Sequence, residues 1–175
     1  MKIKTAVQTC LAKYIDFTGR ASRSEYWWFV LAVVIAGFII SIIGNMIFGY
    51  DPQTLVPREQ LSTIFGLLMF FPLLSAAWRR MQDSGRQGWL VLLPMIVSLI
   101  SFVGLVAGIG IFGLMERDAV DAAALDAVQQ QGRMMAVSGV GAVAVVQLIL
   151  SLLMIYWLVQ PSDPRTNRHG PPPAN

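Results

Sequence analysis

Hydrophobic residues in this chain are gathered into four long blocks rather than spread in an amphipathic pattern. The blocks cover residues 27–48, 61–78, 89–115 and 134–159, and none of them contains Asp, Glu, Lys, Arg or His. At a rise of about 1.5 Å per residue, each block can cross a hydrocarbon core of roughly 30 Å, the second only barely. Because a backbone that crosses lipid must satisfy its own polar groups, we expect all four blocks to be helices.

The pattern therefore predicts an all-α polytopic membrane protein with four transmembrane helices and an N-terminal interfacial helix. Charged residues make up 13% of the chain, about half of the ~25% that is usual in a soluble domain. Residues 1–16 carry apolar side chains at three- and four-residue spacing, which is typical of a short helix lying on a membrane surface. These side chains are Val7, Leu11, Tyr14 and Ile15.

One four-span membrane domain is expected over residues 1–160, followed by a Pro-rich cytoplasmic tail over 161–175. We expect the tail to be an extended or disordered end, except that Asn167–Gly170 can fold back on the inner surface. A polyproline partner motif is the alternative. Residues 116–131 are rich in alanine and free of Gly and Pro, so a helical extension outside the membrane is expected there.

Lysine and arginine are sorted unevenly among the segments that flank the blocks. The N-terminal segment, the middle loop and the tail are basic, whereas the two remaining loops hold only Arg58, and Arg117 with Arg133. The positive-inside rule then places both termini and the middle loop in the cytoplasm. All five tryptophans fall at block ends on this same side, which is the pattern of an aromatic belt. A docking surface for a headgroup or partner helix is the alternative for those tryptophans.

Small residues and prolines within the blocks predict how the helices pack. Gly104 and Gly108 form a GxxxG pair in the third block, and the fourth block opens with a run of small residues at 138–142. We expect the third and fourth spans to pack closely within one molecule, with a homodimer seam as the alternative. Pro72 and Pro94 are expected either to form matching bends on the two sides of the middle loop or to be ordinary membrane-helix prolines.

The middle loop, Trp78–Trp89, is the most distinctive segment of the chain. It places Arg79, Arg80 and Arg86 around a single acid, Asp83, with a tryptophan at each edge. We expect Asp83 to pair with an arginine of the same surface, the candidates being Arg80, Arg86, Arg20 and Arg23. A second basic segment precedes the first block, where Ser22 followed by Glu25 is a capping box that predicts a helix start.

Three motifs now stand in order along the chain. They are F-x-G-R-x-x-R-x-E-Y-W at 17–27, R-R-x-x-D-x-G-R-x-G-W at 79–89, and N-R-H-G-P at 167–171. Together they resemble the bacterial inner-membrane proteins of domain-of-unknown-function family 805. The resemblance covers essentially the whole chain and implies a small helical inner-membrane protein without an established activity. The chain has Met81-Gln82 where this family usually has Leu-His, so no proton or metal role of that histidine is expected.

The sequence predicts no enzyme, no cofactor and no metal site. Its single histidine, His169, lies in the tail, its single cysteine is Cys10, and no phosphate loop or metal-ligand spacing is present. A catalytic role of Asp83 is the weak alternative to an ion pair. The spans carry no ionisable residue, which argues against a coupled transporter. The basic residues are explained by topology before nucleic acid, and no nucleic-acid partner is expected.

The function favoured by the sequence is a lipid- or partner-binding scaffold in the bacterial inner membrane. The partners expected are the bilayer, anionic lipid in particular, and a membrane protein or a second copy of the chain. Charge-assisted hydrogen bonds from arginine suit phosphate groups, although the same arginines can simply set topology. A passive pore or a transporter subunit is the alternative function. The residues expected at the binding surface are Arg20, Arg23, Arg79, Arg80, Asp83, Arg86 and Trp89.

Overall fold

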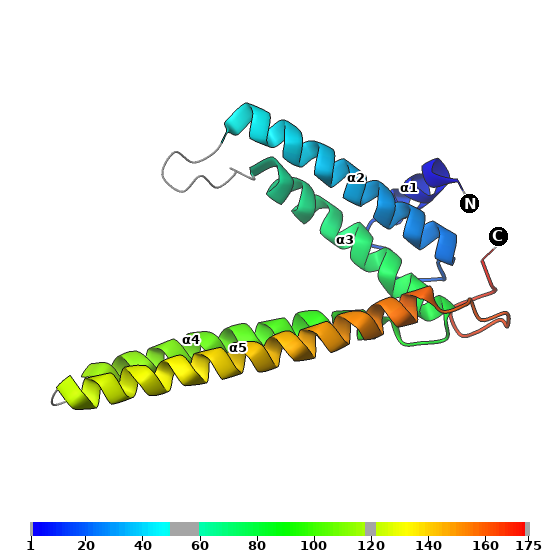
Figure 1. Cartoon of the computed structure of the whole chain (residues 1–175). Helices are drawn as coiled ribbons and strands as arrows, with labels where there is room; N and C mark the ends of the chain where they lie inside the picture. The colour runs from blue at the N-terminus through cyan, green and yellow to red at the C-terminus, as the bar shows by residue number, and fades with distance from the viewer. Residues whose placement is uncertain (1, 50–59, 118–121, 174–175) are drawn as a thin grey trace. The chain divides into compact units, whose positions relative to one another are not determined.

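The computed structural model describes residues 2–49, 60–117 and 122–173, and these residues are mainly helical (Figure 1). Four stretches of helix are long and apolar enough to cross a membrane, so the expected all-α, four-span fold class is confirmed. Arg58 lies outside the described residues. The elements in order are α1 (Ile3–Ala12), α2 (Arg23–Phe48), α3 (Gln60–Asp83), the 3₁₀ turn η1 (Gly88–Leu92), α4 (Leu93–Arg117) and α5 (Ala122–Val159).

The chain divides into two compact units, and each is described by itself. The first unit comprises Met1–Val91 together with Trp157–Asn175 and holds α1, α2 and α3. The second unit is Leu92–Tyr156 and holds α4 with most of α5. The expected single domain over residues 1–160 stays a prediction.

The start of α2 is specified by its own sequence. Ser22 has an extended backbone and its Oγ accepts a hydrogen bond from the backbone N–H of Glu25 at 3.2 Å. This is the first half of the expected capping box. The Glu25 carboxylate does not complete the box, because it pairs with Arg79 on α3 instead.

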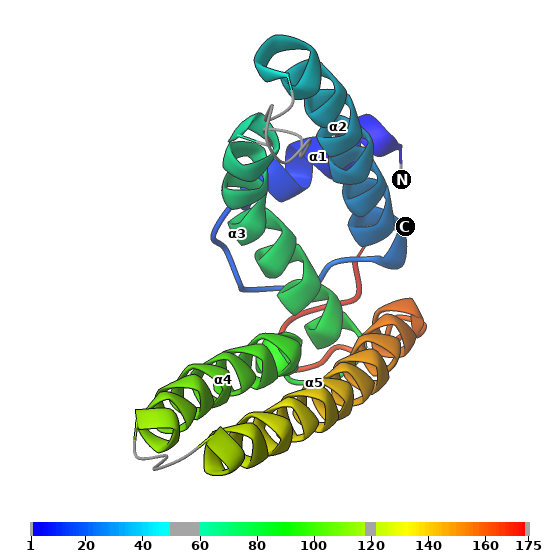
Figure 2. The same cartoon turned by 60° about the vertical axis from the view of Figure 1, so that its left-hand side comes forward.

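Helix α1 lies beside α2 and α3 (Figure 2). Its buried positions are Ala6 and Cys10, four residues apart and therefore on one face. Both side chains are small, so the helix approaches its neighbours closely. The predicted N-terminal helix is thus present, although it is shorter than residues 1–16. Leu11 and Ile15 from the predicted apolar stripe are exposed on the surface.

Pro72 lies inside α3 and explains how the segment after α1 is held. A proline has no N–H, so the carbonyl four residues earlier, that of Leu68, loses its partner within the helix. The Tyr14 hydroxyl donates to this Leu68 carbonyl. Ser75 Oγ, one turn further along α3, donates to the carbonyl of Lys13 at 3.0 Å. The proline therefore opens a hydrogen-bonding position that fixes the α1–α2 connection on α3.

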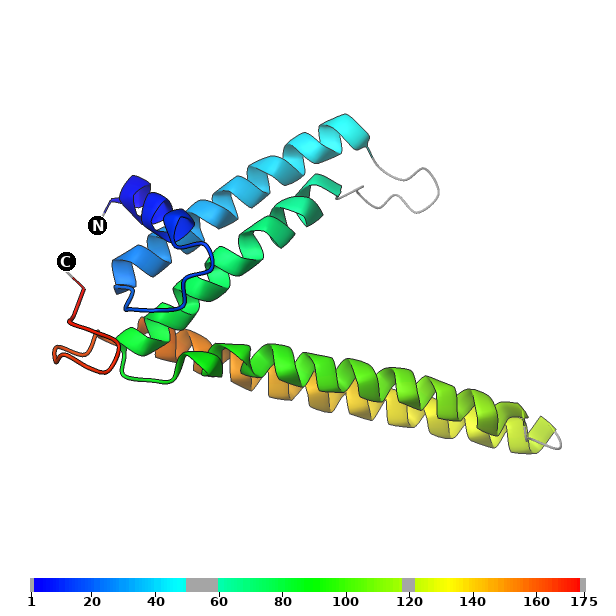
Figure 3. The same cartoon turned by 180° about the vertical axis from the view of Figure 1, so that it is seen from behind.

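In the second unit, α4 and α5 run side by side (Figure 3). The expected close packing through small residues is wrong, because a Cβ added at Gly104 or Gly108 would meet nothing within 4 Å. The two helices instead meet where Phe112 lies against Gly132, and where the Gln147 amide donates to the Pro94 carbonyl at 3.1 Å. Bulky and polar contacts, rather than backbone proximity, join this pair.

Pro94 also differs from expectation. It stands at the second residue of α4, directly after η1, where an absent N–H costs the helix nothing. It therefore marks a helix start and forms no bend that matches Pro72. The expected helical extension beyond the fourth block is confirmed, because α5 already begins at Ala122.

Replacing Tyr14 by Phe should lower the free energy of unfolding by about 1 kcal/mol, since the Leu68 carbonyl then loses its donor. The same change in a Pro72→Ala background should cost much less, because the restored N–H at position 72 supplies that donor. Thermal unfolding in detergent measures both effects. Tyr156→Phe, at an exposed tyrosine, is the control. Equal costs of Tyr14→Phe in the two backgrounds would show that the hydroxyl does not serve this carbonyl.

Candidate functional site

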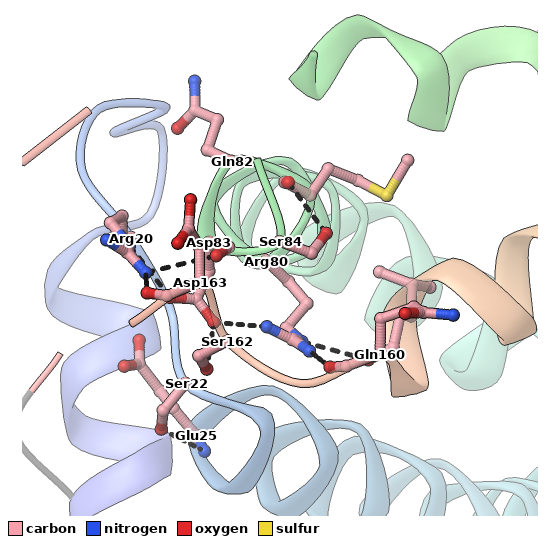
Figure 4. A network of polar contacts seen from close by, with 12 residues as sticks. Arg20, Ser22, Glu25, Arg80, Gln82, Asp83, Ser84, Gln160, Ser162 and Asp163 are labelled. Carbon is pink, nitrogen blue, oxygen red and sulfur yellow. Dashed lines mark hydrogen bonds and ion pairs between the residues drawn. The ribbon is translucent and has the colours of Figure 1, made fainter. Parts of the chain in front are cut away.

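The two arginine motifs and the tail meet in the first unit around Asp83. This carboxylate is at the last residue of α3 and is completely buried. Arg20 Nε donates to its Oδ1 at 2.9 Å, and Arg80 Nη1 pairs with its Oδ2. Ser162 Oγ from the tail also donates to Oδ2. The predicted pairing of Asp83 with arginine is confirmed, and the acid lies between two guanidinium groups (Figure 4).

Arg20 joins the segment before α2 to the tail. Besides its bond to the Asp83 side chain, it donates from Nη2 to the Asp83 carbonyl at 3.2 Å and to the Asp163 carbonyl. Its Nη1 donates to the carbonyls of Arg165, at 2.8 Å, and Gly170, at 3.3 Å. The five donors of one planar side chain thus organise three segments, which an ammonium group with three donors does not match.

Arg80 performs the corresponding task for the end of α5. Its Nε donates to the Leu158 carbonyl at 3.0 Å, and its Nη2 donates to the Gln160 carbonyl. The last carbonyls of a helix have no partner within that helix. A cation at this end also interacts favourably with the helix dipole. Arg80 therefore caps α5 while it neutralises Asp83.

The tail is held along its length by these contacts. The backbone N–H of Asp163 donates to the Asp83 carbonyl at 2.9 Å, and the Asn167 side chain donates to the Gln82 carbonyl at 3.0 Å. Asn167 and Gly170 form a tight antiparallel bridge, with Gly170 at φ 117°, a conformation that favours glycine. The fold-back of residues 167–170 is therefore confirmed, and an extended or disordered end is wrong for residues 160–170.

Arg79 forms a second buried ion pair, with Glu25 of α2. Its Nη1 lies 2.9 Å from Glu25 Oε1, and Arg79 itself is fully buried. Cys10 Sγ lies between them, 3.8 Å from Glu25 Oε1 and 3.9 Å from Arg79 Nη2. Burial first, and then the Glu25 carboxylate, raise the pKa of the Cys10 thiol to about 11. The thiol is thus a protonated packing group at neutral pH.

The structure explains two further positions of the middle motif, Gln82 and Gly88. With its amide nitrogen turned toward carbonyl oxygens, Gln82 donates to Phe17 at 3.0 Å and to Gly19 at 2.7 Å, and accepts from Trp78 Nε1 at 3.0 Å. A Cβ on Gly88 would lie 2.1 Å from that same Trp78 nitrogen, so only glycine fits there. The neutral amide of Gln82 thus forms hydrogen bonds with three partners.

Three residues of the predicted binding surface stand apart from this buried network. Arg23 is exposed and makes no ion pair with any residue that the structure describes. Arg86 lies over the ring of Trp157, 5.6 Å from its centroid. Trp89 is 46% exposed, and its Nε1 donates to Gln87. The structure therefore brings together Arg20, Arg80 and Asp83 and pairs Arg79 with Glu25. It leaves Arg23 and Trp89 exposed and Arg86 half-buried over Trp157.

Charge is partitioned between the inside and the outside of the first unit. Arg20, Arg79 and Arg80 are buried with Glu25 and Asp83. The remaining described cations of this unit lie on the surface or are half-buried: Lys2, Lys4, Lys13, Arg23, Arg86, Arg165 and Arg168.

Only Asp16 and Asp163 oppose these cations among the described acids of the unit, and both are half-buried. Hydrogen bonds from Thr18 lower the pKa of Asp16, so it stays ionised. Burial, then Arg168 and Arg20, lower the pKa of His169, so its ring is neutral at pH 7. The described surface of the first unit is therefore predominantly basic.

The charged side chains of this arrangement hold parts of the fold together, because both carboxylates are engaged in ion pairs. Glu25 and Asp83 are buried and held by arginine, so neither carboxylate is presented to a substrate. Within the described ranges, no three His, Cys, Asp or Glu side chains gather as metal ligands. The network can fix loops and a helix end, while the exposed arginines can contact an anion.

Sequence reasoning missed Glu25 as the partner of Arg79, and it missed the tail residues Ser162 and Asp163. Glu25 was assigned to the capping box, because its i+3 spacing from Ser22 is a sufficient local explanation. The tail contacts run mostly to backbone carbonyls, which leave no signature in side-chain chemistry. The only available signal was the polar Asn167–Gly170 motif after an apolar span.

Comparison with known proteins agrees with this layout of motifs. The family model described as "Protein of unknown function (DUF805)" matches residues 14–171, which include all three motifs. The chain belongs to the DUF805 family. The match also includes the tail that the buried arginines hold. The region shared by the family therefore extends beyond the four spans into the tail.

Two relatives of the chain come from Escherichia coli K12. The inner membrane protein YhaH is 37% identical over 94 residues, covering 54% of this chain and 72% of YhaH. The inner membrane protein YhaI is 40% identical over 96 residues, covering 53% of this chain and 75% of YhaI. No solved structure matches the chain. With four helices able to span a bilayer, this DUF805 protein is a multi-pass membrane protein.

Asp83→Asn should lower the free energy of unfolding by about 3–5 kcal/mol, because two buried guanidinium groups would lose their shared counter-charge. The tail should become sensitive to protease at the same time, since Arg20 and Arg80 hold it through this carboxylate. Thermal unfolding and limited proteolysis in detergent measure the two effects. Asp126→Asn, at an exposed acid of α5, is the control. Equal stability of the two variants would remove the structural role given to Asp83.

Cys10 should resist alkylation in the folded protein. With a pKa of about 11 in place of 9.0, the thiolate fraction at pH 8 falls by about 100-fold, and burial restricts the reagent further. Maleimide labelling followed by mass spectrometry, before and after denaturation in SDS, measures this. Arg79→Met should increase labelling by loosening the cluster. Rapid labelling of folded wild-type protein would contradict the burial of the thiol.

Proposed function

We propose that this DUF805 protein is a membrane-embedded scaffold whose basic surface binds anionic phospholipid. The observation that carries this proposal is the partition of charge in the first unit. The two acids of the motifs, Glu25 and Asp83, are buried and matched by arginine, so they do not repel an anion at the surface. Arg23, which makes no ion pair within the described part of the chain, and the tail arginines remain exposed.

The proposal divides the arginines of the predicted binding surface into two groups, those that build the fold and those that contact lipid. Arg20, Arg79 and Arg80 form the framework, since each is buried and bonded to the protein. Arg23, with Arg86 and Trp89 at the edge of the middle loop, supplies the contacts to lipid. Guanidinium binds phosphate through charge-assisted, often bidentate hydrogen bonds. Tryptophan holds such contacts at the depth of the headgroups.

The basic surface is proposed to face the cytoplasm, with both termini on that side. Support comes from the positive-inside sorting of lysine and arginine and from the described tail, which folds against the segment before α2. Reporter fusions after Asn175 and after Gln131 should therefore report opposite sides of the inner membrane. Two fusions that report the same side would refute this orientation.

The lipid proposal is tested by removing exposed charge without touching the buried network. Arg23→Gln/Arg168→Gln should weaken the preference for phosphatidylglycerol over phosphatidylcholine by about fivefold or more, since each cation near an anionic surface contributes on the order of this factor. The matched control is Arg117→Gln/Arg133→Gln, which removes two exposed arginines from the other end of the spans. Copurified lipid in mild detergent, quantified by mass spectrometry, is the measurement.

The outcomes separate the proposed function from its alternatives. If wild type and both variants retain the same lipid mixture, the lipid scaffold is refuted. Retention of an acidic protein that is lost only in Arg23→Gln/Arg168→Gln would favour a partner-binding scaffold. Solute flux through liposomes that contain the wild-type protein would favour the passive pore or transporter subunit.

A further inference from the structure

A shallow groove lies on the outward side of α2, at the charged end of the helix. Its lining residues are Ser24, Trp27, Trp28 and Leu31. Their spacing of three, four and seven residues places them along one face of the helix. The groove therefore runs parallel to the span, from the first turn of α2 toward its apolar middle.

This groove is separate from the packed core of the first unit. Phe29 of α2 belongs to the buried cluster with Cys10 and Ala76, and Glu25 turns inward to Arg79. The groove face is more open, because Trp28 is 41% exposed. Its lining is almost wholly apolar apart from the Ser24 hydroxyl, so it suits a hydrocarbon chain rather than a polar solute.

A positively charged residue precedes the groove in the first turn of α2. Arg23 is adjacent to Ser24 in sequence, is exposed, and makes no ion pair with any residue in the described part of the chain. The acid closest to it on α2, Glu25, is already matched by Arg79 at 2.9 Å. An exposed cation next to an apolar groove is complementary to an anionic headgroup joined to an acyl chain.

We propose that this groove holds one anionic phospholipid, with its phosphate on Arg23 and the Ser24 hydroxyl and one acyl chain along Trp27, Trp28 and Leu31. The inference rests on the proposed lipid-binding function and gives that function a specific site. The direction of the groove supports lipid over a peptide, because acyl chains lie parallel to a membrane span. Guanidinium with an interfacial tryptophan matches the headgroup end.

The test is native mass spectrometry of the full chain in mild detergent with added phosphatidylglycerol. Wild-type protein should retain one tightly bound phosphatidylglycerol. Arg23→Gln removes the phosphate contact, and Ser24→Leu fills the groove with apolar volume without opening the core. Each should reduce the lipid-bound population by about fivefold or more, while circular dichroism stays like that of wild type. Ser24→Leu also removes the 3.1 Å hydrogen bond between Ser22 Oγ and Ser24 Oγ, so Arg23→Gln is the variant that should keep the wild-type thermal unfolding.

Two control variants lie in the same unit, on α1 and outside the groove. Leu11→Ala removes an apolar side chain that is 40% exposed, against 41% for Trp28, and Lys4→Gln removes another exposed cation. Both should keep the tightly bound lipid. Glycerol phosphate, which has the headgroup chemistry but no acyl chain, should not displace it.

The outcomes distinguish this site from the broader proposal. If the control variants lose the bound lipid as strongly as Arg23→Gln and Ser24→Leu, the groove is refuted, while a lipid-binding basic surface stands. Displacement by glycerol phosphate at equal concentration would likewise refute the acyl-chain groove. If wild-type protein shows no preference for phosphatidylglycerol over phosphatidylcholine, the proposed function fails together with the site.

Discussion

The first unit depends on one carboxylate held between two guanidinium groups. Asp83 ends α3, and through Arg20 and Arg80 it connects the segment before α2, the last turn of α5 and the tail. Burying these ions costs several kcal/mol each unless every charge and donor is matched. The match is made largely by backbone carbonyls that have no other partner. The ion pairs therefore determine which segments meet, more than how strongly the unit is held together.

The same physics explains why arginine fills the buried positions. Arg20 donates to several carbonyls in addition to a carboxylate, which requires a planar group with five donors. Arg80 combines charge neutralisation with capping of α5. A lysine offers a point charge that is costlier to remove from water. The exposed cations are not subject to this requirement, and the proposed function assigns them to an anionic leaflet.

The division between framework and surface leads to the proposed function. With the motif acids neutralised inside, the described surface of the first unit carries mainly positive charge, together with the exposed Trp28 and Trp89. Such a surface suits phosphate at headgroup depth. The groove on α2 begins at Ser24, and the preceding residue, Arg23, makes no ion pair with any residue that the structure describes. The DUF805 motifs are thereby divided between positions that build the fold and positions, such as Arg23, that are left to bind.

The sequence by itself determined the four helices, the start of α2 at Ser22 and the pairing of Asp83, because hydrophobic length, local capping and a lone acid among bases are local signals. It did not determine that Arg79 pairs with Glu25, that Tyr14 serves the carbonyl freed by Pro72, or that Gly104 and Gly108 face open space. Those features depend on contacts between distant segments, many of them to backbone atoms that every residue carries. Only the tertiary structure decided which arginines are buried and which remain available to a ligand.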